Sequence, residues 1–362
     1  MTLAKRFAAL VATFILGRRR LWPMLLATGF AIGPIAASPL SVDAAVVQVC
    51  PSGCAFTTIQ GALASAGNGD EIDIAAGTYS GGFTTSVNVA LVGSGAGSTV
   101  VTGGGPVMTV PMGTTVAVSS LSITGGNNPG GSGGGILNLG QLTLTRVAIA
   151  GNAAAYGGGI TNVGVLTLNG IVTNNAATVN GGGIFNRPTA RVTVEDSTLT
   201  DNTAGRFGAG IRNLGTMTID SSVVSDNSTN SDGMGGGISN AGRLSVSDSS
   251  IIGNAGGAGG GGLENVNEAG GAAGIEGTTT TPGTAGLSHT QIAGNTAAYG
   301  GGILQLGGNL TIVGGLINFN TASVVGGGIF LSDGVVTLVN SSVVTNAPDN
   351  CAPPNSVAGC TG

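Results

Sequence analysis

Three aspartates, Asp196, Asp220 and Asp248, recur near the same place in successive repeats of this chain. If the repeats stack, their carboxylates would lie about one coil apart along one side of the molecule. Glycoside hydrolysis uses such a pair of carboxylates, one as the acid and the other as the base or nucleophile. Aspartates at the corners of β-structures also commonly form Asx turns, in which the side chain only satisfies the backbone, and we favour this structural role.

Four arginines in adjacent repeats form the main concentration of basic residues. They are Arg187, Arg191, Arg206 and Arg212, and they lie near Glu195 and Asp201 in the sequence. No motif ties these charges together, so surface ion pairing is the preferred interpretation. We therefore assign no catalytic residue. The candidates for an enzymatic alternative are Asp196, Asp220, Asp248, Arg187 and Arg212.

The sequence predicts no metal or cofactor site. His289 is the only histidine, and it falls at a position that is polar in other repeats, so a surface histidine is the preferred interpretation. Other repeats fill this position with Arg146, Asn169, Asp196, Asp248 and Asn340. The aspartate that calcium-binding nonapeptide repeats require is missing from the glycine-rich blocks.

A repeated unit must position these residues. A block close to Gly-Gly-Gly-Ile-x-Asn occurs eight times between Gly133 and Leu331. Its hydrophobic position forms one column: Ile136, Ile160, Ile184, Ile211, Ile238, Leu263, Ile303 and Ile329. A second column of asparagines ends an apolar-x-x-Asn element: Asn152, Asn175, Asn202, Asn227, Asn254, Asn295, Asn320 and Asn346. Periods of 20 to 50 residues indicate solenoids, propellers or arrays.

The unit inside the period is made of short strands. Runs such as Leu142-Thr143-Leu144 alternate apolar and hydroxyl residues, which is typical of a strand with one buried face. Three such strands in a repeat of roughly 25 residues predict an all-β parallel β-helix, whereas a propeller blade needs about 40 residues. We expect roughly eleven coils, which at one strand spacing each span on the order of 50 Å.

These blocks resemble the G-G-A-I and F-x-x-N repeats of chlamydial polymorphic outer-membrane proteins. They also resemble the coils of bacterial secreted right-handed parallel β-helix proteins. The segments Thr57–Leu63, Gly69–Ile74 and Gly77–Tyr79 are similar to the opening of pectin-lyase-like β-helices. The resemblance implies a right-handed β-helix. It also implies that polysaccharide lyases are related by fold, and these use acidic calcium ligands and a basic residue that takes the substrate proton.

Both ends of the solenoid are expected to be closed. Thr57 and Gln60 have the spacing of a capping box, so we expect a short helix that buries Ile59, Ala62, Leu63 and Ala66 over the first coil. The four cysteines lie in two local pairs, Cys50 with Cys54 and Cys351 with Cys360. Disulfides suit an exported solenoid whose terminal coils lack a neighbour. A four-cysteine metal site would require the two ends to meet.

Residues 1–44 combine a basic start with an apolar run and small residues, which predicts a signal peptide; an uncleaved signal anchor is the alternative. Residues 45–362 are then a single domain, with an N-terminal cap at about 50–80, regular repeats at 133–346 and a C-terminal disulfide cap at 347–362. Six arginines remain against fifteen acidic residues, a net charge of −9. Nucleic acid is a poor partner for such a surface.

Two further features bear on binding. The step from Leu263 to Ile303 contains an insertion at 266–286, and such loops often carry the binding function of a solenoid. We favour a tolerated surface insertion, because long flexible loops cost little free energy. Outward hydroxyls, as at Thr143, form a ladder that would suit ice binding only beside a second threonine column, and the neighbouring column is irregular.

We therefore expect an exported surface or extracellular protein with a structural or adhesive role. The alternative is a polysaccharide lyase or glycoside hydrolase that acts on an extracellular polysaccharide. The expected partner is a polysaccharide or a host or cell-surface protein, and the chain is expected to be a monomer without an integral membrane domain once the signal is removed.

Overall fold

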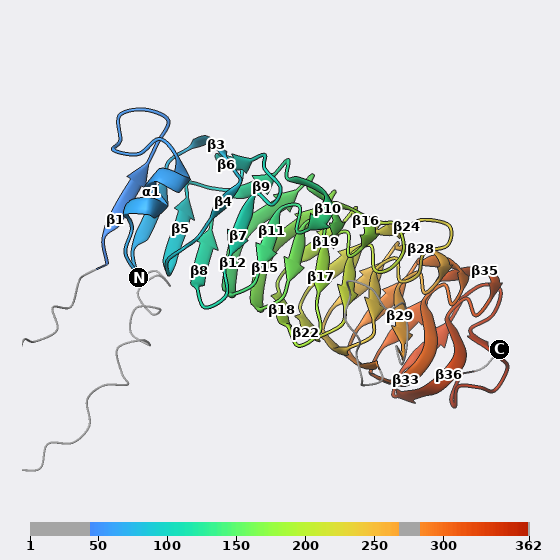
Figure 1. Ribbon diagram of the computed structural model, residues 1–362. Helices are drawn as coiled ribbons and strands as arrows, with labels where there is room; N and C mark the ends of the chain where they lie inside the picture. Colours follow the sequence, from blue (N-terminus) through green and yellow to red (C-terminus); the bar gives the residue numbers. More distant parts are fainter. Residues whose placement is uncertain (1–43, 268–282, 361–362) are drawn as a thin grey trace, which may run out of the picture. The chain divides into compact units, whose positions relative to one another are not determined.

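The computed structural model describes residues 44–267 and 283–360. Except for Ala44, the predicted signal peptide lies outside these residues. Most of the predicted insertion, 268–282, and the last two residues of the C-terminal cap also lie outside them. Residues from Ala44 onward form one compact unit. Figure 1 shows its strands lying side by side, coil after coil, from β1 (Val46–Val49) to β36 (Ile329–Val339).

The unit is a parallel β-solenoid of about 11 turns, which confirms the predicted all-β architecture. Three ladders of parallel strands run along it, and the first carries the Ile-x-Asn blocks. Its strands are β4 (Phe83–Thr84), β7 (Met108–Val110), β11 (Ile136–Asn138), β14 (Ile160–Asn162), β17 (Ile184–Asn186), β21 (Ile211–Asn213), β25 (Ile238–Asn240), β29 (Leu263–Val266), the starts of β33 (Ile303–Val313) and β36, and β38 (Cys351–Ala352).

The second ladder carries the runs that alternate apolar and hydroxyl residues. It contains β1, β2 (Glu71–Ile74), β5 (Val89–Gly93), β8 (Thr115–Ser119), the first parts of β12 (Gln141–Ala150) and β15 (Val165–Thr173), β18 (Arg191–Glu195), β22 (Thr216–Asp220), β26 (Arg243–Ser247), β30 (Thr284–Ser288) and the ends of β33 and β36.

The third ladder closes each coil. It contains β3 (Gly77–Ser80), β6 (Thr99–Thr102), β9 (Ser122–Thr124), the ends of β12 and β15, β19 (Thr198–Thr200), β23 (Val223–Ser225), β27 (Ser250–Ile252), β31 (Gln291–Ala293), β34 (Leu316–Asn318) and β37 (Ser342–Val344). Side chains that alternate inward from all three ladders make one continuous hydrophobic core.

The two asparagine columns form buried ladders. In the first, the Asn138 amide donates to the Asn162 Oδ1 at 2.7 Å, and the same bond repeats from coil to coil. In the second, the Asn202 side chain and backbone both donate to the Asn227 Oδ1, at 2.9 and 3.0 Å. Each buried amide is thus satisfied by its neighbours, as buried polar groups must be.

A fourth strand in each regular coil was not predicted. These strands form a separate parallel sheet of eight members beside the Ile-x-Asn ladder: β10 (Asn127–Ser132), β13 (Ala153–Tyr156), β16 (Ala176–Asn180), β20 (Thr203–Ala204), β24 (Ser228–Thr229), β28 (Ala255–Gly259), β32 (Thr296–Tyr299) and β35 (Thr321–Val325). The middle residue of each Ile-x-Asn strand is consequently buried from Thr161 to Leu304, although strand alternation alone would expose it.

The glycine blocks connect this fourth strand to the Ile-x-Asn strand. The first glycine of a block takes a left-handed conformation, as at Gly181 with φ of 68°. The third glycine packs on the next coil, where a Cβ at Gly183 would lie 2.6 Å from the Gly210 carbonyl oxygen. Glycine is required at both positions, for conformational and for steric reasons respectively.

Helix α1 (Ile59–Ser65) covers the first coils and buries Ile59, Ala62 and Leu63, as predicted, whereas Ala66 is its half-buried C-cap. Its N-cap is Thr58 rather than the predicted Thr57: the Gly61 N–H donates to the Thr58 Oγ1 at 3.2 Å. Behind the helix, the Asp70 carboxylate accepts backbone N–H bonds from Gly67 and Ala45, which lower the pKa of Asp70. The first bond connects the end of the helix, and the second the start of β1, to the residue that precedes β2.

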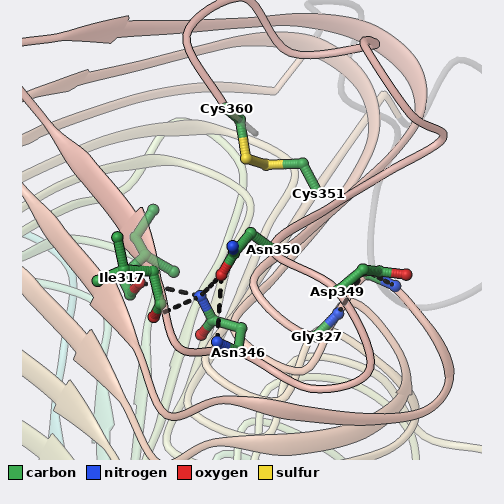
Figure 2. Close-up of a disulfide and its surroundings, with 9 residues drawn as sticks. Ile317, Gly327, Asn346, Asp349, Asn350, Cys351 and Cys360 are labelled. Atoms are coloured by element: carbon green, nitrogen blue, oxygen red, sulfur yellow. Dashed lines mark hydrogen bonds between the residues drawn. A yellow bond between two sulfur atoms is a disulfide. The ribbon is translucent and has the colours of Figure 1, made fainter. Parts of the chain in front are cut away.

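Both predicted disulfides are present, Cys50–Cys54 and Cys351–Cys360. Cys351 and Cys360 belong to the buried core, together with Val357 between them. Figure 2 shows this disulfide near Asn346, whose amide donates to the Asn350 Oδ1 at 3.1 Å and so ends the second asparagine ladder. The C-terminal segment therefore plugs the apolar interior of the last coil.

Candidate functional site

The outward side chains of β18, β22, β26, β30 and the end of β33 form a polar surface that we call the hydroxyl face. Its middle row is Thr193, Thr218, Ser245, Gly286 and Thr311. On one side lies an arginine row, Arg191, Thr216, Arg243, Thr284 and Asn309. On the other lies an acidic row, Glu195, Asp220, Ser247 and Ser288.

Strand alternation creates this face. In β18 the side chains of Val192 and Val194 point into the core and are 3% and 0% exposed, which leaves the residues between them facing outward. Strand pairing in exact register repeats the pattern in every coil, so each row advances by one strand spacing of about 4.8 Å.

Two adjoining hollows open on the hydroxyl face. The first has a volume of about 490 Å³ and lies beside the arginine row; it is lined by Thr189, Leu214, Gly215, Thr216, Gly242, Arg243 and Thr284. The second has about 280 Å³ and is lined by Arg243, Leu244, Ser245, Thr284, Ala285, Gly286, Asn309 and Thr311. Arg243 and Thr284 border both. Gly286 interrupts the hydroxyl row at the second hollow, and a Cβ there would meet only open space.

The three predicted aspartates do not form one row. Asp196 and Asp248 occupy left-handed corners with φ of 46° and 47°, and Ser221 takes the equivalent corner between them. Two coils thus separate these carboxylates, roughly 10 Å of backbone spacing. Asp220 lies in the acidic row, between Glu195 and Ser247. Its carboxylate accepts hydrogen bonds from the hydroxyls of Ser221, at 3.0 Å, and Ser247.

His289 occupies the same left-handed corner, with φ of 48°, and its Nδ1 lies 3.8 Å from the Asp248 carboxylate. Both side chains are well exposed, at 70% and 64%, as predicted for a surface histidine. The assignment of Asn169 to this corner was wrong. The coil at Val165–Thr173 is one residue shorter there, so Asn169 pairs with Thr145.

The arginine group predicted from the sequence is divided in the structure. Arg191 lies on the hydroxyl face. Arg187 and Arg206 lie over the rings of Phe185 and Phe207, at 5.7 and 5.1 Å, and Arg206 is exposed.

The predicted surface role is wrong for Arg212, which is 0% exposed. The Arg212 guanidinium lies 4.8 Å from the Phe207 ring. Its Nη1 donates to the Ser239 Oγ at 2.6 Å, and Ser239 donates in turn to the Glu264 carboxylate. These three residues hold the middle position of successive Ile-x-Asn strands, and we call them the buried charged column.

Sequence reasoning did not single out Arg243, Thr284 or Gly286, the residues that shape the hollows. The repeat register held the necessary signal, because Arg243 stands two residues before an outward hydroxyl in the same way as Arg191. Among residues 44–267 and 283–360, no group of three or more histidine, cysteine or acidic side chains could hold a metal ion. The helical segment of the same ranges is too short and insufficiently apolar to cross a membrane.

Comparison with known proteins finds only remote structural similarities. No family model and no curated protein matches the sequence. Pectate lyase Pel9A has a TM-score of 0.44 at 11% identity, over 84% of this chain and 80% of that one. Alginate lyase from Paenibacillus sp. str. FPU-7 has a TM-score of 0.47 at 14% identity, over 82% of this chain and 99% of that one. Pectin methylesterase PemA from Erwinia chrysanthemi has a TM-score of 0.37 at 13% identity, over 72% and 80%. All three TM-scores lie below 0.5, so the resemblances to pectin-lyase-like β-helices and to chlamydial repeats stay predictions.

Proposed function

We propose that this protein binds an extended polysaccharide along the hydroxyl face. The observation that supports the proposal is the pair of adjoining hollows, which share Arg243 and Thr284 and lie within regular rows of hydroxyl and charged groups. A polymer lying along the face would meet polar side chains at successive coils.

The chemistry of the face suits sugars. Threonine and serine hydroxyls both donate and accept, as sugar hydroxyls do, and the Arg243 guanidinium adds several donors in a fixed plane. One hydrogen bond contributes only about 0.5–1.5 kcal/mol net, so appreciable affinity requires several bonds at once. The hydroxyl face supplies such bonds over five consecutive strands.

We place this function outside the cell. The predicted signal peptide and the two disulfides support export, because disulfides persist in oxidising compartments. A capped solenoid that presents a polysaccharide-binding face would then serve an adhesive role.

Catalysis at the same face is the second candidate. Glu195 and Asp220 are paired residues of adjacent coils and so present two carboxylates in one row, and glycoside hydrolysis uses two carboxylates. This pairing favours a glycoside hydrolase over a lyase. The enzymes named above have TM-scores below 0.5 and supply neither a residue nor a reaction for this chain.

The experiment is affinity electrophoresis of the purified chain through gels that contain neutral and acidic polysaccharides, with an assay for new chain ends in the same samples. Retention without new ends supports binding, and new reducing ends that disappear in Glu195→Gln and Asp220→Asn support the second candidate. Absence of retention and of new ends across the panel would reject both.

Arg243→Ala locates the site. Since hydrogen bonds to charged groups contribute about 1.5–3 kcal/mol, we expect it to weaken binding roughly 10- to 100-fold. The matched control is Arg146→Ala, because Arg146 is an exposed corner arginine that reaches only the Ser120 hydroxyl, at 3.3 Å, outside the hydroxyl face. Equal losses in the two variants would show general charge attraction instead of a site.

A further inference from the structure

We infer that the C-terminal end of the solenoid pairs with the same end of a second copy of this chain. The surface concerned is the open edge of two strands in the last coil, Val335–Val339 of β36 and Ser342–Val344 of β37, which we call the C-terminal edge. The inference does not depend on the proposed polysaccharide.

The C-terminal edge lacks a strand partner within residues 44–267 and 283–360. On one side, β36 and β37 pair with β33 and β34 of the preceding coil. On the other side, β38 pairs only with Ile329 and Phe330. The disulfide segment plugs the apolar interior, as the buried Val357 and Cys360 show, but it does not extend the ladder over Val335–Val339. The unpaired N–H and C=O groups of such an edge are a template for another strand.

The outward rows become apolar where the edge begins. The acidic row contains Glu195, Asp220, Ser247 and Ser288, and then changes to Val313 and Val339. The arginine row ends in Val335. Val335, Val339 and Val344 are 54%, 41% and 46% exposed. Exposed valines on an unpaired edge are the opposite of the charged residues with which monomeric proteins protect their edges.

The edge sequence is self-complementary in an antiparallel pair. With Thr337 on the two-fold axis, Val335 faces the partner's Val339 and Thr337 faces the partner's Thr337, all on the outward side. On the inward side Val336, which is 8% exposed, faces the partner's Leu338. The same surface thus serves both copies, as a two-fold interface requires, and no side chain must change from the core side to the solvent side.

The charge of the C-terminal end also permits contact between two copies. The sequence from Ile303 to Cys360 contains only two charged residues, Asp333 and Asp349, so two such ends repel each other weakly. A second copy of this chain is therefore the occupant that fits the edge.

Sedimentation velocity of the purified chain between about 1 and 100 µM, a range that covers modest affinities, tests the inference. The wild-type chain should form dimers with rising concentration. Thr337→Lys and Thr337→Glu, each studied alone, should be monomers, because like charges would lie opposite each other across the axis. An equal mixture of the two variants should restore the dimer as a Lys–Glu pair.

The matched control is Thr143→Lys, an exposed outward residue of the same ladder near the other end of the solenoid, which should leave the dimer intact. Circular dichroism checks that every variant is folded. A wild-type chain that stays monomeric throughout the range would overturn the inference. So would a dimer that survives Thr337→Lys, or a loss of dimer that mixing does not restore.

Discussion

At the scale of single residues, the asparagine ladders hold the coils in register. The Asn227 side chain takes part in four bonds: its Oδ1 accepts from the backbone and side chain of Asn202, and its amide donates to the Asn254 Oδ1 and the Leu199 carbonyl. Every partner is buried, so no water can replace a lost bond without opening the core.

We expect Asn227→Ala to lower the free energy of unfolding by roughly 3 kcal/mol or more, because each buried group left unsatisfied costs about 1–3 kcal/mol. Urea denaturation measures this change. Asn230→Ala is the control, since Asn230 is exposed, and it should cost less than about 0.5 kcal/mol. Equal costs for the two variants would contradict a structural role for the ladder.

Phe319, in contrast to the ladder asparagines, is unfavourable at its position, because its backbone has a left-handed conformation. It has φ of 55° and is 64% exposed, at a corner where earlier coils place Asn174, Asp201, Asp226 or glycine. A bulky side chain in this left-handed conformation costs about 1–2 kcal/mol and gains little burial here.

Phe319→Asn should therefore stabilise the protein by roughly 1 kcal/mol. The reciprocal change, Asn174→Phe, places a phenylalanine at the equivalent corner, with φ of 53°, and should destabilise by a similar amount. Thermal denaturation of both variants checks the pair, and a destabilised Phe319→Asn would show that the ring makes a stabilising contact.

At the scale of elements, the fourth strand encloses side chains that a three-strand coil would expose. The buried charged column lies between the Ile-x-Asn ladder and this outer layer, where flanking coils carry apolar Phe185 and Leu304. Buried opposite charges of this kind add little net stability, but the loss of one of them is costly.

We expect Arg212→Leu and Glu264→Leu to destabilise the chain by about 3–5 kcal/mol each, because each removes one charged member of a buried hydrogen-bonded chain and leaves the opposite charge buried. The double variant should lie within about 2 kcal/mol of wild type, since apolar side chains fill this position elsewhere. Denaturation of the wild type, the two single variants and the double variant completes a double-mutant cycle. Costs that simply add would mean that the two charges are independent.

Much of the element plan could be predicted from the sequence, because the period of the isoleucine and asparagine columns specifies the strand register directly. The fourth strand could not, since sequences such as Ala255–Gly259 carry no alternating pattern and are strands only through pairing with their neighbours. Arg212 is buried because the fourth strand covers it. A prediction without the fourth strand therefore could not foresee that burial. Gly286 lines the second hollow, and its place there appears only when the rows are assembled.

At the scale of the whole unit, the solenoid consists of coils that contact mainly their neighbours, so its stability is a sum of local terms and its ends are the weakest parts. The Cys351–Cys360 disulfide restrains the last coil, while Cys50–Cys54 restrains the first.

Replacing Cys351 and Cys360 by serine should reduce hydrogen-exchange protection in β36, β37 and β38, and leave β18 to β26 unchanged. Replacing Cys50 and Cys54 is the matched change at the other end and should affect only the first coils. A uniform loss of protection along the chain would contradict this local picture and indicate one cooperative unit.

We propose that a polysaccharide lies along the hydroxyl face. The most direct test is the crystal structure of the chain with an oligosaccharide from whichever polymer it retains. We predict sugar density over β22, β26 and β30, with Arg243 and Thr284 hydrogen-bonded to it. Density confined to any other surface, with both hollows empty, would contradict the account.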